Sequence, residues 1–133
     1  MNILVVDDSR FLRLANERAL VKGGHRVTSA CDGEEALESA HRQKPDLVIL
    51  DMMLPKLSGL EVLRALRQNP ETARLPVMVL TSLPQCNEAR VVSDGATAFF
   101  EKSRLKLDED SARLVEEVDR LFSRIARAKT ASQ

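Results

Sequence analysis

Three uninterrupted apolar blocks constrain the fold of this chain more than any other feature of its sequence. Each spans four residues, at 3–6, 47–50 and 77–80, and none of them alternates with polar residues. A continuous apolar run of this length is typical of a strand that is buried on both faces, as in a parallel sheet covered by helices. Two weaker blocks, at 26–29 and 97–100, complete a set of five predicted strands with room for a helix in every gap.

The segments between these blocks carry helix patterns. Apolar residues recur at three- and four-residue steps in the segment that follows Ser9, and a pair of glycines predicts the end of that helix. Asp32 and Ser58 are each followed three residues later by a glutamate, which is the spacing of a capping box and predicts two further helix starts. Helices are also predicted over about 85–93 and about 111–129, the second with an apolar stripe along one side.

The resulting order βαβαβαβαβα predicts a single domain of the α/β class. We expect a doubly wound, five-stranded parallel sheet with right-handed crossovers, five helices and the flavodoxin-like strand order 2-1-3-4-5. The chain has 133 residues, which is the size of one domain. We expect this domain to span 1–129, followed by a short flexible tail at 130–133.

Charge and composition exclude several classes of protein. The 20 basic residues balance the 20 acidic ones, whereas a non-specific nucleic-acid binder normally carries a basic excess. No apolar run approaches the length that crosses a bilayer and no signal peptide is visible, so we expect a cytoplasmic protein. Cys31 and Cys86 are too few for a disulfide scaffold and are expected to be inert, and His25 and His41 are expected on the surface.

The residues that follow the predicted strands carry the chemistry, because the functional crevice of an open α/β sheet lies at the carboxyl ends of its strands. Asp7 and Asp8 follow the first strand, Asp51 the third, Thr81 the fourth and Lys102 the fifth. Strands 1 and 3 are neighbours in the expected order, so the three acids would lie side by side and repel one another unless a cation is bound. Hard oxygen ligands of this kind suit Mg2+, and a carboxylate beside Mg2+ can act as the nucleophile that forms an aspartyl phosphate.

This set of residues resembles the receiver domain of two-component response regulators, and the short chain resembles the single-domain type. The resemblance runs from about Asn2 to Leu121. Each matching element is weak alone, but the whole set in order, each at a predicted strand end, is highly specific. The matching residues are Asp7-Asp8, Asp51-Met52-Met53-Leu54-Pro55 with Gly59, Thr81-Ser82, and Gly95-Ala96 leading to Phe99 and Lys102.

The resemblance implies that Asp51 accepts a phosphoryl group from a phosphohistidine on a sensor histidine kinase or a histidine phosphotransfer protein. It also implies that Asp8 and Asp51 bind Mg2+ directly, that Asp7 acts mainly through water, and that the backbone carbonyl of Met53 completes the protein ligands. Such a domain catalyses only its own phosphoryl transfer and dephosphorylation, so no other enzyme activity is expected.

The resemblance further implies a switch. Thr81 would move toward the phosphoryl group, Phe99 would change rotamer to fill the vacated space, and Lys102 would pair with the phosphoryl oxygens. The switching face of such domains comprises helix 4, strand 5 and helix 5, and its target would be a downstream protein rather than nucleic acid or membrane. No motif in the sequence names that target or the cognate kinase.

Several positions depart from the family pattern. Ser103 stands where a proline usually follows the lysine, so a trans Lys102–Ser103 bond is expected, because a non-proline cis bond costs about 2.5–4 kcal/mol. Phe99 lacks the hydroxyl of the more common tyrosine. Met53 and Leu83 are apolar and cannot orient water, which predicts slow hydrolysis of the phosphoryl group.

The sequence leaves alternatives open. The chain could be a stand-alone receiver or the N-terminal receiver of a longer regulator. It could also be a receiver-like scaffold that works without phosphorylation. A Mg2+-dependent phosphatase with an aspartyl intermediate is a further class, but such enzymes place a second acid two residues after the nucleophile, where this chain has Ser9 after Asp7.

Overall fold

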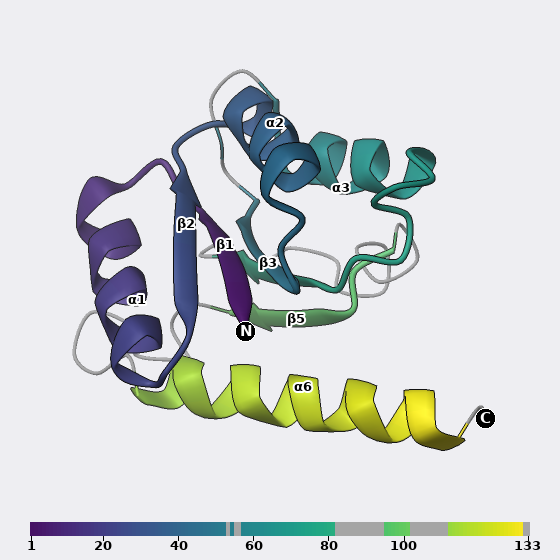
Figure 1. Ribbon diagram of the computed structural model, residues 1–133. Helices are drawn as coiled ribbons and strands as arrows, with labels where there is room; N and C mark the ends of the chain where they lie inside the picture. Colours follow the sequence, from purple (N-terminus) through teal and green to yellow (C-terminus); the bar gives the residue numbers. More distant parts are fainter. Residues whose placement is uncertain (53, 55–56, 82–94, 102–111, 132–133) are drawn as a thin grey trace.

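A computed structural model describes residues 1–52, 54, 57–81, 95–101 and 112–131. Within these residues the chain forms one five-stranded parallel sheet of order β2-β1-β3-β4-β5, which confirms the predicted fold class and strand order (Figure 1). The last strand begins at Ala98 and not at Thr97 as predicted. The strands are β1 (Asn2–Val6), β2 (Arg26–Ala30), β3 (Leu47–Asp51), β4 (Val77–Thr81) and β5 (Ala98–Glu101).

Three of the described helices begin where the capping residues predict. The side chains of Ser9, Asp32 and Ser58 each accept a hydrogen bond from the backbone N–H three residues later, which satisfies a donor left open at a helix start. The predicted helix over 85–93 lies outside the described residues. The helices are α1 (Arg10–Lys22), α2 (Gly33–Gln43), α3 (Gly59–Gln68) and α6 (Ala112–Ala131), and α6 therefore includes the first two residues of the expected tail.

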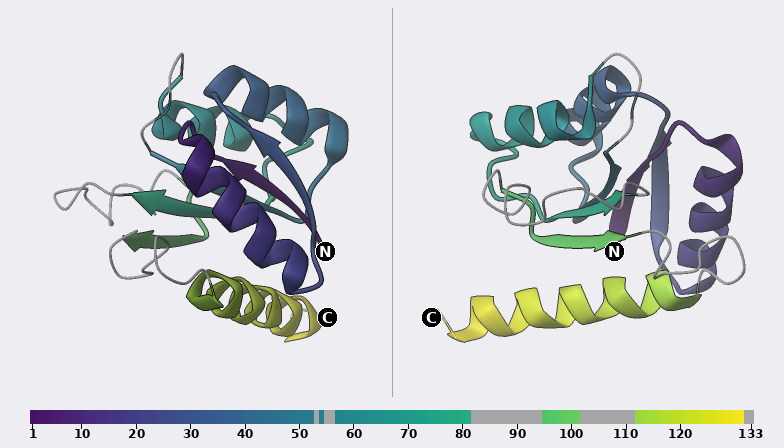
Figure 2. Two further views of the ribbon diagram at one scale, coloured as in Figure 1. Left: turned by 90° about the vertical axis from the view of Figure 1, so that its left-hand side faces the viewer. Right: turned by 180° about the vertical axis from the view of Figure 1, so that it is seen from behind.

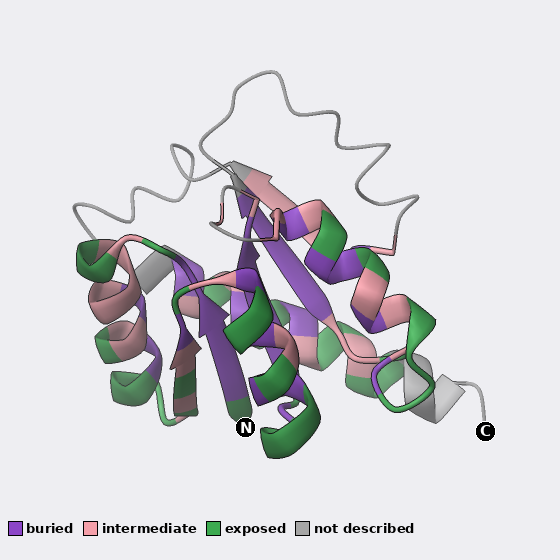
Figure 3. Cartoon of the chain, turned by 90° about the horizontal axis from the view of Figure 1, so that it is seen from above, coloured by how far each residue is buried: buried purple, intermediate pink, exposed green. Residues whose placement is uncertain are grey.

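Helices cover both faces of the sheet, with α2 and α3 on one face and α1 and α6 on the other (Figures 1 and 2). Successive strand residues point to opposite faces, so the side chains of β1 divide between two cores. Leu4 and Val6 pack in the core beneath α2 and α3, and Ile3 and Val5 pack in the core beneath α1 and α6. Both faces of the central strands are therefore buried (Figure 3), which is why their sequences are continuous apolar blocks.

The surface position predicted for His25 is wrong. Only 9% of its side chain is exposed, and its Nε2 lies 3.1 Å from the Oδ1 of Asp119 on α6. Its ring also packs against Phe122, with the ring centroids 5.9 Å apart. His25 follows α1 and is covered because α6 lies beside α1, an arrangement between distant segments that no local pattern reports. His41 is exposed as expected.

Across the described helices there is no stretch long and apolar enough to span a membrane.

Candidate functional site

Three carboxylates meet at the carboxyl ends of β1 and β3. Asp7 directly follows β1, Asp8 is the next residue, and Asp51 is the last residue of β3. Because β1 and β3 are paired with Val6 opposite Leu50, their carboxyl ends lie together. One carboxylate oxygen from each acid lies within 4.8 Å of the others. The structure thus brings the three acids together, as the strand order predicts.

Asp7 is fixed by bonds to its backbone and its side chain. Its N–H donates to the carbonyl oxygen of Ala30 on β2 at 3.2 Å, and its Oδ1 accepts from the N–H of Ser9 at 2.9 Å. Its carbonyl oxygen accepts from the Nη1 of Arg13 at 2.9 Å. Asp7 is only 3% exposed. The turn between β1 and α1 therefore holds this carboxylate in one place while Asp8 faces solvent.

The backbone at the start of α3 lies in close contact with the backbone of Asp51 and Met52. Asp51 is 5% exposed. The N–H of Gly59 at the start of α3 donates to the carbonyl oxygen of Met52 at 3.0 Å. A Cβ on Gly59 would overlap the carbonyl oxygen of Asp51 and lie 2.6 Å from the Cα of Met52. Only glycine fits this contact without movement of the backbone, which explains why Gly59 belongs with the Asp51 motif.

The donor set of this cluster fits a hard divalent cation. Two of the three carboxylates are buried, so their charges repel one another with little screening by water. Mg2+ is bound in proteins through a few carboxylates and retains several waters, and the exposed side of the cluster at Asp8 leaves room for such waters.

A second group of possible metal-ligating side chains, Cys31, Asp32 and Glu35, follows β2. The Sγ of Cys31 lies 3.0 Å from the Oε2 of Glu35. This hydrogen bond, slight burial and the negative charges of Glu35 and Asp32 raise the pKa of the Cys31 thiol. Because metals bind the thiolate, a thiol held protonated is a poor ligand. This group therefore lacks the character of the carboxylate cluster. Cys31 is exposed rather than packed in the core, and its inertness stays a prediction.

The other predicted site residues are placed only in part. Thr81 ends β4, the strand next to β3, so its backbone lies at the same edge of the sheet as Asp51. Phe99 is partly buried on β5 and packs against the core beneath α2 and α3. Met53, Leu83, Lys102 and Ser103 lie outside the described residues, and so does the Lys102–Ser103 bond.

Two residues that hold the site were not singled out from the sequence. Ser9 was identified only as a helix start, yet its N–H also binds the Asp7 carboxylate. Arg13 was not identified at all. The only local signal for Arg13 is a basic residue one turn into a helix that begins beside two acids, and many solvent-exposed arginines share that position.

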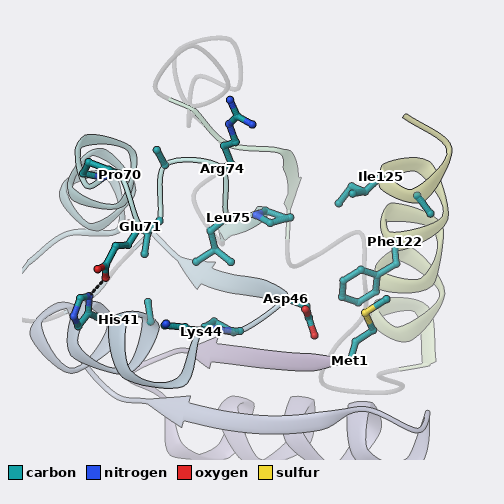
Figure 4. Close-up of a pocket in the computed structure, with 16 residues that line it drawn as sticks. Met1, His41, Lys44, Asp46, Pro70, Glu71, Arg74, Leu75, Phe122 and Ile125 are labelled. Carbon is teal, nitrogen blue, oxygen red and sulfur yellow. Dashed lines mark ion pairs between the residues drawn. The ribbon is translucent and has the colours of Figure 1, made fainter. Parts of the chain in front are cut away.

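A cavity of about 600 Å3 lies elsewhere, at the amino ends of the strands (Figure 4). Its walls include Met1, Leu75 and the side chains of Phe122 and Ile125 on α6, and the ion pair between His41 and Glu71 lies at its far side. It shares no residue with the carboxylate cluster. The candidate site is therefore located by the chemistry of its side chains, at the opposite edge of the sheet from this cavity.

Comparisons with known proteins identify relatives of this chain. The family described as response regulator receiver domain matches residues 3–118. A gliding motility regulatory protein of Myxococcus xanthus is 40% identical over 123 residues, which cover 91% of this chain and 15% of that protein. The response regulator MprA of Mycobacterium leprae is 40% identical over 114 residues, which cover 86% of this chain and 49% of that protein. The chain therefore spans about half or less of the length of these relatives.

Solved structures show the same fold. The receiver domain of the Francisella response regulator 1452 superposes with a TM-score of 0.80 at 27% identity and covers 93% of this chain and 98% of its own. The chemotaxis response regulator CheY4 of Vibrio cholerae also gives a TM-score of 0.80 at 27% identity, with 90% of this chain and 97% of its own covered.

Proposed function

This chain belongs to the response regulator receiver domain family, and from that membership we propose that it is a phosphorylation-controlled signalling domain whose phosphoryl acceptor is Asp51. The donor is a phosphohistidine on a sensor histidine kinase or a histidine phosphotransfer protein. The observation that carries the proposal is the cluster of Asp7, Asp8 and Asp51, with carboxylate oxygens within 4.8 Å of one another at the carboxyl edge of the sheet.

Strand order favours Asp51 as the acceptor among the three acids. Its strand, β3, lies between β1 and β4, so the Asp51 carboxylate has the two other acids on one side and the strand end with Thr81 on the other. Asp8 lies in the turn after β1, whereas Asp51 is fixed on a strand.

The transfer is a displacement at phosphorus. A carboxylate oxygen of Asp51 forms the new O–P bond as the P–N bond of the phosphoimidazole breaks, and the electron pair of that bond returns to the imidazole nitrogen. Mg2+, when bound, neutralises the carboxylates and the phosphoryl oxygens. Asp8 and Asp51 would hold it directly, Asp7 through water, and the carbonyl of Met53 would complete the set. Thr81 and Lys102 would bind the remaining phosphoryl oxygens.

The proposed output is a change of protein binding. A phosphoryl group adds about −1.5 to −2 of charge, which becomes a signal by biasing an element that has two arrangements. The proposed element is the face formed by the helix predicted over about 85–93, β5 and α6, with Thr81 and Phe99 as the switching residues and a downstream protein as the target. In this proposal the domain works in the cytoplasm and catalyses nothing beyond its own phosphorylation and dephosphorylation.

The same domain serves either by itself or as the receiver part of a longer regulator. The relatives above, in which it covers 49% and 15% of the length, support the second arrangement. The proposed chemistry at Asp51 is the same in both.

The test is an intact-mass measurement after incubation with acetyl phosphate, with Mg2+ or with EDTA. We expect one phosphoryl adduct on the wild type with Mg2+ and none on Asp51→Asn. Asp46→Asn is the matched control, because Asp46 precedes the same strand at its opposite end and should leave the adduct intact. An adduct that survives Asp51→Asn, or that forms equally well in EDTA, would overturn the proposal.

A further inference from the structure

Arg13 links α1 to the strand end that carries two of the three acids. Its backbone N–H donates to the carbonyl oxygen of Ser9 at 2.9 Å, which places it in the first turn of the helix. Its half-buried side chain turns back, and Nη1 donates to the carbonyl oxygen of Asp7 at 2.9 Å. A charged donor makes this one of the stronger classes of hydrogen bond.

The bond from Arg13 affects Asp8 because of the atom that accepts it. The carbonyl oxygen of Asp7 belongs to the peptide unit that joins Asp7 to Asp8, and that unit is planar and rotates as one body. The bond from Arg13 therefore fixes the rotation of this unit and with it the direction in which the Asp8 side chain leaves the backbone. Asp7 is already held through its N–H and its carboxylate, whereas Asp8 is exposed. Asp8 thus depends on this peptide unit for its orientation.

We propose that Arg13 is a positioning residue that orients the Asp7–Asp8 turn so that the acid cluster can bind a divalent cation. The proposal deepens the function proposed above and rests on it. Arg13 does not touch the cation in this role and acts through the carbonyl oxygen of Asp7.

The charge of Arg13 makes the proposal sharply testable, because charge and positioning predict opposite results. A guanidinium close to a cation site repels the cation, so an arginine that acted only through its charge would weaken Mg2+ binding. Its removal would then tighten binding. A positioning residue has the reverse effect: its removal loosens the turn and weakens binding. Loss of a group that orients a metal ligand typically costs 10–100-fold in affinity.

The experiment measures the Mg2+ dissociation constant by isothermal titration calorimetry for the wild type, Arg13→Ala and Arg13→Gln. We expect both substitutions to weaken Mg2+ binding by roughly tenfold or more. Arg18→Ala is the matched control, because Arg18 is an exposed arginine of the same helix and its removal changes the net charge equally. We expect its dissociation constant to equal that of the wild type.

A second readout needs no metal. The amide resonance of Asp8 in EDTA reports the peptide unit directly, and we expect it to shift or broaden in both Arg13 variants and to stay in place in Arg18→Ala. Unchanged or tighter Mg2+ binding in the Arg13 variants would overturn the proposal. A lower melting temperature with an unchanged dissociation constant would do the same, because it would show a merely structural role.

Failure of this inference is distinct from failure of the proposed function. If wild-type protein binds Mg2+ and is phosphorylated on Asp51 while the Arg13 variants match it, only the role of Arg13 falls. If the wild type itself takes no phosphoryl group in the presence of Mg2+, the proposed function falls, and the role of Arg13 falls with it.

Discussion

Asp8 is the residue of the acid cluster that faces solvent, and its charge has opposite effects with and without a cation. In EDTA it repels the two buried carboxylates, so Asp8→Asn should raise the free energy of unfolding, by roughly 0.5–1 kcal/mol for charges that water partly screens. With Mg2+ the wild type should gain stability by mass action, and Asp8→Asn should lose most of that gain. Thermal unfolding in EDTA and at several Mg2+ concentrations measures both effects.

The control for Asp8 is Glu116→Gln, which removes one exposed carboxylate from α6. This variant should match the wild type in EDTA and be stabilised equally by Mg2+. The interpretation of the cluster fails if Asp8→Asn is less stable than the wild type in EDTA, or if Mg2+ stabilises both proteins to the same extent.

Cys31 gives a second prediction about a single residue. The hydrogen bond to Glu35 is the largest cause of its raised pKa, so less thiolate is present at any given pH and alkylation should be slow. Glu35→Gln removes the charge and should lower the pKa and speed the reaction with iodoacetamide at mildly alkaline pH. Mass spectrometry resolved by peptide measures Cys31 separately from Cys86.

Glu38→Gln is the matched control for Cys31. Glu38 lies on the same helix and pairs with Arg42 at 3.3 Å, so its substitution should leave the alkylation rate unchanged. Equal rates in the wild type and Glu35→Gln would show that the carboxylate does not control the thiol.

At the scale of elements, the segments easiest to predict from the sequence are the strands that are buried on both faces. β1, β3 and β4 have helices on both faces, and their continuous apolar blocks report that directly. β2 lies at the edge of the sheet and alternates between exposed and partly buried residues until Ala30, so its pattern is weaker. The helix starts are predictable because capping is a local interaction between a side chain and the next turn.

The carboxylate cluster is predictable for a related reason. Each acid follows its strand directly, so strand order alone brings Asp7 and Asp51 together. The contacts that fix them are harder to predict, because the bond from Arg13 depends on the path of a turn. The burial of His25 depends on where α6 packs, and neither arrangement leaves a periodic signal in the sequence.

Arg67 joins three elements and gives a prediction at this scale. Its Nε donates to the carbonyl oxygen of Gly95 at 2.9 Å, and its Nη1 donates to carbonyl oxygens in the turn between α3 and β4, including that of Leu75 at 2.6 Å. Burial lowers the pKa of the guanidinium, which nevertheless stays charged. Arg67→Ala would leave these carbonyl groups without their donor and should lower the free energy of unfolding by about 2–3 kcal/mol in urea titrations.

Arg74→Ala serves as the control for Arg67, because Arg74 is an exposed arginine in the same turn. It should change stability little. A loss in Arg67→Ala no larger than in Arg74→Ala would show that the bonds to the carbonyl oxygens contribute little.

At the scale of the whole molecule, the two cores meet at the central strands, and this predicts how stability is distributed. Amides of β1 and β3 are paired on both sides and lie between two helical layers, so they should exchange with deuterium only through global unfolding. β2 is paired only with β1 and is partly exposed, so its amides should exchange through smaller local openings. Hydrogen exchange measured in EDTA and in Mg2+ tests this ordering.

Mg2+ extends the same prediction to the site, because a cation that binds only the folded protein raises the cost of global unfolding. Exchange in β1 and β3 should therefore slow with Mg2+ concentration in the wild type, whereas exchange through local openings of β2 that leave the acid cluster intact should stay nearly constant. Asp8→Asn should remove most of the dependence in β1 and β3. If β2 exchanges as slowly as β3, or slows equally with Mg2+, then the sheet opens as one unit and its edge strand has no separate stability.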